Sequence, residues 1–223
     1  MSKSLFVRRR ARISSFVHRF IKRTDGIAAV EFALIVPIMA TMFIGSVEMS
    51  QAITANRRVT MVASTIGDLA ARNDANVTDA QILDMMNVGT YLLEPFKAYN
   101  ASWPANVLKV TLSVVGSSAT DATKTKLEWQ CSYNASNTIS VSCTCPQTNI
   151  VIPAGLVTTS DYVVIATATY GYKPPVFDVF MKTGYGNEVG GVYSFVDTVY
   201  AKPRAIVPAL TIGAGAPCAM PAF

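Results

Sequence analysis

A single carboxylate, Glu31, interrupts an otherwise apolar run that begins after Gly26. The stretch reads GIAAVEFALIVP, and the glutamate stands five positions after the glycine. A carboxylate in hydrocarbon is costly unless it is paired. Glu31 is therefore expected to pair with a cation, to extend to the headgroup layer, or to pair with an unrelated helix. Glu31 is therefore the first candidate functional residue.

Four cysteines form a second set of residues with chemical potential: Cys131, Cys143, Cys145 and Cys218. Cys143 and Cys145 are too close in sequence to bond each other comfortably, so each is expected to pair with Cys131 or Cys218, which leaves two connectivities. C-x-C also occurs at zinc sites, but the chain offers no second clustered pair and no histidine near it. In an oxidising compartment, the sequence predicts two disulfides and no metal site.

The sequence carries no recognisable catalytic set. The sole histidine, His18, lies in the N-terminal segment, so the rest of the chain has no imidazole for a Ser/His/Asp or Cys/His relay. Asp161, Asp178 and Asp197 each stand singly in a predicted strand or loop, and neither a P-loop nor a dinucleotide fingerprint is present. We predict that the protein is not an enzyme and uses no cofactor.

The charge of the chain is concentrated at its N-terminus. Residues 1–25 hold eight of the 19 lysines and arginines against one acid, which gives this segment a charge of +7, whereas the remaining residues have a net charge of −2. The sequence pI near 9.1 therefore describes the N-terminal segment, and nucleic-acid binding by the remainder is disfavoured. Basic residues before a membrane segment hold that side in the cytoplasm.

The apolar run at 27–47 is long enough to cross a bilayer. It holds 21 residues, which as a helix rise about 30 Å, the thickness of a hydrocarbon core. A cleaved secretory signal, of twin-arginine type given RRRAR, is the simple alternative. Secretory signals have a shorter apolar core that ends at a cleavage site of small residues, and this chain shows neither feature. We therefore predict a membrane span, with the residues after 47 on the periplasmic side.

Helical periodicity extends on both sides of this run. The basic leader has apolar residues near helical period and is expected to form an amphipathic helix on the inner leaflet. A single helix is predicted over 27–72, kinked at Pro37. Beyond the span its period is marked by Met49, Ile53, Asn56, Val59, Ala63, Ile66 and Ala70. Thr78 and Gln81 form a capping-box pattern for a second, shorter helix that ends before Pro95.

The second half of the chain is rich in strand patterns. VLKVTLSV at 107–114 alternates apolar and polar residues, and KLEWQCSY and TISVSCTC flank the turn-rich NASN as in a hairpin. DYVVIATATYGY and GVYSFVDTVYAKPR supply two longer strands. We predict an α+β fold: a long N-terminal transmembrane and amphipathic helix, a short helix, and an antiparallel sheet of about five strands with one face against the helix. The predicted parts are 1–26, 27–47 and 48–223.

The segment from Gly26 to Phe32 resembles the processing site of prepilins, a glycine followed by four residues, Glu and Phe. GIAAVEFALIVPIM, Glu48 and STIGDLAAR are similar to the TadE/TadG-like minor pilins of tight-adherence (Tad) systems, and TVYAKPR resembles the closing strand of some of them. The resemblance is specific over about residues 22–72 and diffuse beyond.

This resemblance implies cleavage between Gly26 and Ile27 by a prepilin peptidase, with Glu31 and Phe32 serving recognition and assembly. A glycine before the cut lets the backbone enter a tight cleft, and the new amine of Ile27 can neutralise Glu31 in its own or a neighbouring subunit. For Pro37 the resemblance implies a point where the helix melts during assembly, and a simple kink is the alternative. Glu48, at the far end of the span, is expected to be solvated.

The sequence therefore favours a minor pilin or pseudopilin that assembles with the inner membrane, other pilins and Tad assembly-platform proteins. An uncleaved single-pass inner-membrane scaffold is the alternative and has the same topology. A periplasmic enzyme with a retained signal anchor is a third hypothesis, which the missing catalytic set disfavours. Assembly of the cleaved form would carry the domain to the cell surface.

Overall fold

The structure is a computed structural model, and it describes residues 26–73, 77–99, 107–135, 140–146, 148–174, 192–204, 210–211 and 218. The predicted leader helix lies outside the described residues. The chain divides into two compact units, Met1–Val47 and Glu48–Phe223. Helix α2, Ile27–Ala71, contributes residues to both units, and each unit is described by itself.

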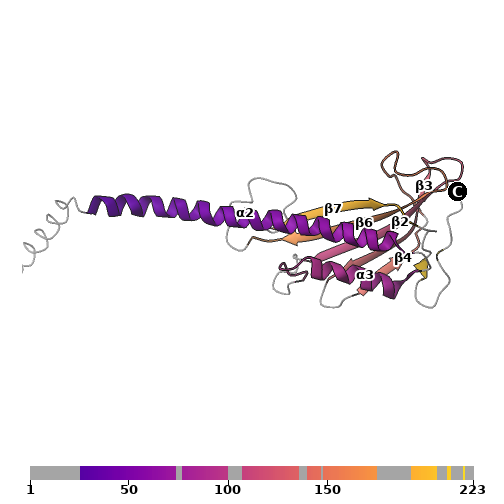
Figure 1. Cartoon of the computed structure of the whole chain (residues 1–223), viewed down its shortest axis with the longest axis horizontal. Helices are drawn as coiled ribbons and strands as arrows, with labels where there is room; N and C mark the ends of the chain where they lie inside the picture. The colour runs from indigo at the N-terminus through magenta and orange to yellow at the C-terminus, as the bar shows by residue number, and fades with distance from the viewer. Residues whose placement is uncertain are drawn as a thin grey trace, which may run out of the picture. The chain divides into compact units, whose positions relative to one another are not determined.

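The second unit has the α+β fold that the sequence predicts. Helix α3 covers Asp79–Leu92. The sheet has six strands in the order β4-β3-β2-β6-β7, with β5 beside β3, and all of its pairs are antiparallel. The labelled strands can be followed in Figure 1. The strands of this sheet are β2 Leu108–Ser117, β3 Thr125–Asn134, β4 Ser140–Thr144, β5 Thr148–Asn149, β6 Tyr162–Tyr172 and β7 Tyr193–Ala201.

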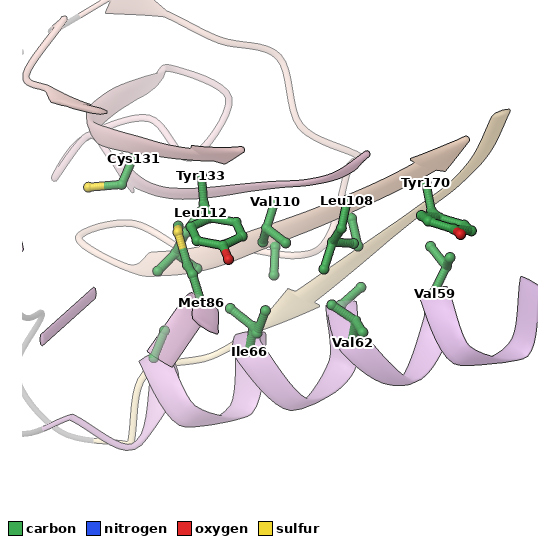
Figure 2. Packing of buried hydrophobic residues seen from close by; sticks show 14 of the residues in the cluster. Val59, Val62, Ile66, Met86, Leu108, Val110, Leu112, Cys131, Tyr133 and Tyr170 are labelled. Atoms are coloured by element: carbon green, nitrogen blue, oxygen red, sulfur yellow. The ribbon is translucent and has the colours of Figure 1, made fainter. Parts of the chain in front are cut away.

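The hydrophobic core lies between the sheet and the two helices. Alternate residues of β2 point from the sheet toward the helices, where Val59, Val62 and Ile66 of α2 and Met86 of α3 meet them (Figure 2). The β2 residues on this face are the predicted apolar set, Leu108, Val110, Leu112 and Val114, and each is fully buried. The two-residue period thus places the core face of β2 correctly.

Small residues let α2 approach the sheet closely. A Cβ added to Gly67 would lie 3.3 Å from the Cβ of Ala166 on β6, so the helix and the sheet are nearly in contact there. The buried residues of α2 are Glu48, Ala52, Ala55, Val59, Val62, Ala63, Ile66, Gly67, Ala70 and Ala71.

The periodic residues of α2 are buried from Val59 onward and exposed before it. Met49 and Ile53 are 54% and 48% exposed, and Asn56 is also exposed. The sheet is met instead by Ala52 and Ala55, because small side chains allow the backbone to come closer than methionine or isoleucine would. The residues that mark the helical period are therefore not the ones that face the sheet in this turn.

Helix α3 begins as its sequence predicts. Thr78 is the N-cap, its side chain accepts a hydrogen bond from the Gln81 backbone, and the Gln81 side chain accepts one from the Thr78 backbone, which completes a capping box. The helix ends at Leu92, before Pro95. Just ahead of it, β1 Val77–Thr78 pairs in parallel with β8 Leu210–Thr211 near the C-terminus.

The chain after β7 is tied back to the end of α2. The backbone N–H of Arg204 donates to the carbonyl of Ala71 at 2.9 Å, where the last carbonyls of a helix have no partner within the helix. The Arg204 guanidinium also lies 3.4 Å from Asp68, which forms an ion pair at 2.6 Å with Arg72. In TVYAKPR the terminal arginine thus acts as a tie between the closing strand and the helix.

Two disulfides are present, and they follow one of the two expected connectivities. Cys131 bonds Cys143 directly across β3 and β4, and Cys145 bonds Cys218 in the C-terminal segment. The sulfur of Cys131 belongs to the core, since this residue is fully buried. The first disulfide therefore crosslinks β3 to the edge strand β4, and the second links the end of β4 to Cys218 in the C-terminal segment.

A β-bulge on β3 buries a carboxyl. Val114 of β2 pairs with Trp129, but Val115 pairs with Leu127, so Glu128 is the extra residue. Glu128 is only 3% exposed. A Cβ at Gly116 would lie 3.0 Å from its Oε1 and 2.8 Å from the Tyr162 ring, so only glycine leaves room for both side chains.

Burial raises the pKa of Glu128 from 4.5 to about 7, so this carboxyl makes folding pH-dependent. The folded state holds the proton more tightly than the unfolded chain, and this contribution to stability is full below about pH 4.5 and is lost as the pH rises to about 7. We expect the free energy of unfolding to fall by about 2 kcal/mol over that range. Glu128→Gln should remove this fall in urea unfolding series at several pH values, and an unchanged pH profile in the variant would contradict the assignment.

Candidate processing and assembly site

Gly26 lies directly before the first residue of α2. Gly26 is exposed, and a Cβ built on it would meet nothing within 4 Å. Ile27 begins the helix, so the Gly26–Ile27 peptide is the junction between the helix and the basic N-terminal segment. No packing in the described structure protects this bond, and a peptidase could reach it.

The first part of α2 is apolar and unburied. The most apolar window of this helix has a mean hydropathy of 2.3, none of it is buried, and this is the one described helix long and apolar enough to cross a membrane. Phe32 is 69% exposed, and most of the other large side chains up to Val47 are similarly open. A surface this apolar requires lipid or other apolar helices around it.

The hydroxyls within this segment are satisfied by the helix itself. Thr41 donates to the carbonyl of Ile38 and Ser46 to that of Phe43, each at 2.8 Å. Such internal bonds leave neither hydroxyl without a partner in hydrocarbon. The helix continues through Pro37, whose missing N–H removes one intrahelical bond.

Glu31 is the one carboxylate among these apolar residues. It is exposed and lies four residues after Ile27, which is about one helical turn and a rise of about 6 Å. Side chains on a helix tilt toward its N-terminus, so the Glu31 carboxylate is directed toward the end where Ile27 lies. The helix dipole also favours a negative charge near this end.

Glu48 is buried, contrary to the expectation that it is solvated. Glu48 is 4% exposed. The pKa of Tyr172 on β6 is raised mainly by the burial of that tyrosine, and the negative charge of Glu48 raises it further. The apolar run ends at Val47, but the folded unit begins at the next residue, so protein rather than water surrounds this side chain. Hydropathy alone could not distinguish these two environments.

The three aspartates considered for catalysis are not brought together. Burial raises the pKa of Asp161, but hydrogen bonds from Lys202, Thr158 and Tyr162 outweigh it and hold the pKa at about 2. Lys202 lies 2.6 Å from this carboxylate, so Asp161 ties the start of β6 to the end of β7. Asp197 faces Ala168 from β7, and Asp178 lies outside the described residues. Among the described residues no group of His, Cys, Asp and Glu could hold a metal ion.

Residues 26–67 match the family described as TadE-like protein. The matched segment begins at Gly26 and includes Glu31, Phe32 and most of α2, so the resemblance drawn from the sequence is confirmed over these residues. Comparisons with curated proteins and with solved structures found no match. The matched family suggests involvement in the Tad pilus system, and its members are pilus-associated proteins that are typically non-enzymatic. The apolar helix fits a single-pass membrane protein.

Proposed function

We propose that this protein, whose helical segment is TadE-like, is a minor pilin or pseudopilin of a tight-adherence pilus and is cut after Gly26 by a prepilin peptidase. The observation that carries the proposal is the combination of an open Gly26–Ile27 junction with a carboxylate one turn into an unburied apolar helix. The basic leader holds that junction at the cytoplasmic face of the inner membrane, and the rest of the chain after residue 47 lies in the periplasm.

Cleavage would create the partner that Glu31 needs. The new α-amine of Ile27 is a cation at the end of the helix toward which the Glu31 side chain is directed. The pair can form within one chain or between neighbouring chains, and the second arrangement sets the axial register of packed helices. Before cleavage this cation does not exist, so processing and assembly are coupled through a single charge.

The folded unit after residue 47 would be the part of the chain that contacts the other proteins of the pilus system. Its sheet is stapled by disulfides, as suits an oxidising compartment, and its contacts would be with other pilins and with Tad assembly-platform proteins. We assign the protein a structural role with no reaction of its own.

Variants at Glu31 test this function. Among chains that are cut after Gly26, Glu31→Leu is expected to be depleted from sheared filaments by tenfold or more, because the new amine has no counter-charge, while Glu31→Asp retains the charge and should be recovered in part. The measurement is the amount of this chain in the sheared filament fraction relative to the membrane. Equal recovery of Glu31→Leu and the unchanged chain would contradict the proposal.

The alternative is an uncleaved single-pass scaffold of the pilus apparatus. The exposed apolar helix and the TadE-like match favour it equally, because both describe an anchored chain as well as a processed one. A scaffold would keep residues 1–26 and would be absent from sheared filaments whatever residue stands at Glu31. The same fractionation therefore separates the two functions.

A further inference from the structure

The sheet face that points away from α2 has an ordered surface of its own. In the register of the five long strands, each residue facing the helices is followed by one facing outward. Three rows of outward residues cross the sheet from β4 to β7. Beyond the third row, Leu127, Val115 and Val163 belong to a buried apolar cluster, against which Ile165 packs, and Ser113 is also buried. The middle row consists of hydroxyl residues only, one from each strand: Ser142, Ser132, Thr111, Thr167 and Thr198.

The hydroxyls of this row are accessible. Ser142, Ser132 and Thr198 are exposed, and Thr111 and Thr167 are half-buried. Thr167 and Thr198 share a hydrogen bond at 3.0 Å. The other three make no side-chain hydrogen bond within the part of the chain that the structure describes. Neighbouring strands lie about 4.8 Å apart, so the row offers hydroxyls at that repeat across the sheet.

The rows on either side keep the same uncharged character. One runs from Ser140 through Asn134, Lys109 and Thr169 to Val196, and the other runs from Thr144 through Gln130, Ser113 and Ile165 to Tyr200. Lys109 is the single charged residue of the three rows. Exposed surfaces ordinarily have about a quarter to a third of their residues charged, so this face is depleted of charge.

The chemistry of the face decides what it can bind. A second copy packed face to face would need apolar inner surfaces, as in stacked sheets, whereas here the central hydroxyls would lose water without gaining apolar contact. A polyanion would need several cations, and the three rows contain one. A neutral polymer rich in hydroxyls matches both the lack of charge and the surplus of donors and acceptors.

We propose that the outer face of the sheet, centred on the row Ser142, Ser132, Thr111, Thr167 and Thr198, binds an uncharged polysaccharide. The sugar hydroxyls exchange hydrogen bonds with the row, and the Tyr200 ring and Val196 at the β7 edge pack against the apolar faces of sugar rings. Val196 is 58% and Tyr200 40% exposed, so both are available for such packing. The inference rests on the sheet alone and does not depend on cleavage after Gly26.

The test is retention of the full chain, purified in detergent, on three insoluble uncharged matrices: cellulose, chitin and cross-linked dextran. Ser132→Ala, Thr167→Val and Thr198→Val together remove three hydroxyls while keeping side-chain size. Each lost hydrogen bond weakens binding several-fold, so the triple variant should bind at least about tenfold more weakly than the unchanged chain. An anionic matrix, cross-linked pectate, is included for comparison.

A matched control makes the same atomic changes elsewhere. Thr54→Val, Thr60→Val and Ser64→Ala alter hydroxyls of α2 that donate to carbonyls of their own helix, so this triple variant should bind as the unchanged chain does. Retention on at least one uncharged matrix that only the sheet variant loses would support the proposal. It would be overturned by retention on none of them, by equal loss in both triple variants, or by binding to pectate alone.

Discussion

Replacing Gly26 by leucine is expected to leave the chain uncut in cells that contain the prepilin peptidase. Gly26 is open, with nothing within 4 Å of an added Cβ, so the leucine should not disturb the folded protein. Inside a peptidase cleft that holds an extended backbone, the same side chain collides. We expect processed chain to fall by at least about a hundredfold, measured as the ratio of cut to uncut chain on immunoblots.

Gly45 provides the matched control for this variant. It lies in the same helix and is equally open, with nothing within 4 Å of an added Cβ. Gly45→Leu should be cut as efficiently as the unchanged chain, because it leaves the junction untouched. If Gly26→Leu were also cut normally, the assignment of the processing site would be wrong.

Loss of the Cys131–Cys143 disulfide is expected to lower the free energy of unfolding of the folded unit by about 3 kcal/mol. The two cysteines are 12 residues apart, and a crosslink of that length restricts the unfolded chain by about this amount in the chain-entropy account. Cys131 is fully buried, so the double variant Cys131→Ala and Cys143→Ala also loses packing. Chemical unfolding of the full chain in detergent, followed by tryptophan fluorescence, measures the change.

The other disulfide serves as the comparison. Cys145 and Cys218 are 73 residues apart, so in the same chain-entropy account their crosslink restricts the unfolded chain by about 4 kcal/mol. Cys145→Ala and Cys218→Ala together should therefore lower the free energy of unfolding by about that amount. A loss well below about 3 kcal/mol for this second pair would contradict the chain-entropy account for this fold.

Local patterns predicted the elements of the fold well. The alternation in β2 and the Thr78–Gln81 capping box depend on neighbouring residues, and both are present as the sequence indicates. Which residues of α2 are buried before Val59 did not follow from its periodicity, because Ala52 and Ala55 are buried through the close approach of the sheet. Such an approach is a property of two elements and cannot be read from one.

The candidate site shows the same division. Gly26 and Glu31 were recognisable from the sequence because the site is a continuous stretch, and their places on α2 follow from helical spacing alone. The burial of Glu48 and Glu128 could not be foreseen from the sequence. Glu48 lies near Tyr172 of β6, and Glu128 is buried because of the β-bulge in the pairing of β3 with β2. The hydroxyl row likewise appears only when five strands are placed in register.

Cleavage after Gly26 is tested by the N-terminal residue and intact mass of the membrane-extracted chain, measured in cells with and without the candidate prepilin peptidase. We expect a chain that begins at Ile27 when the peptidase is present and at Met1 when it is absent. A chain that begins at Met1 in both strains would contradict it, and the uncleaved scaffold would then explain the open Gly26 junction and the exposed apolar helix.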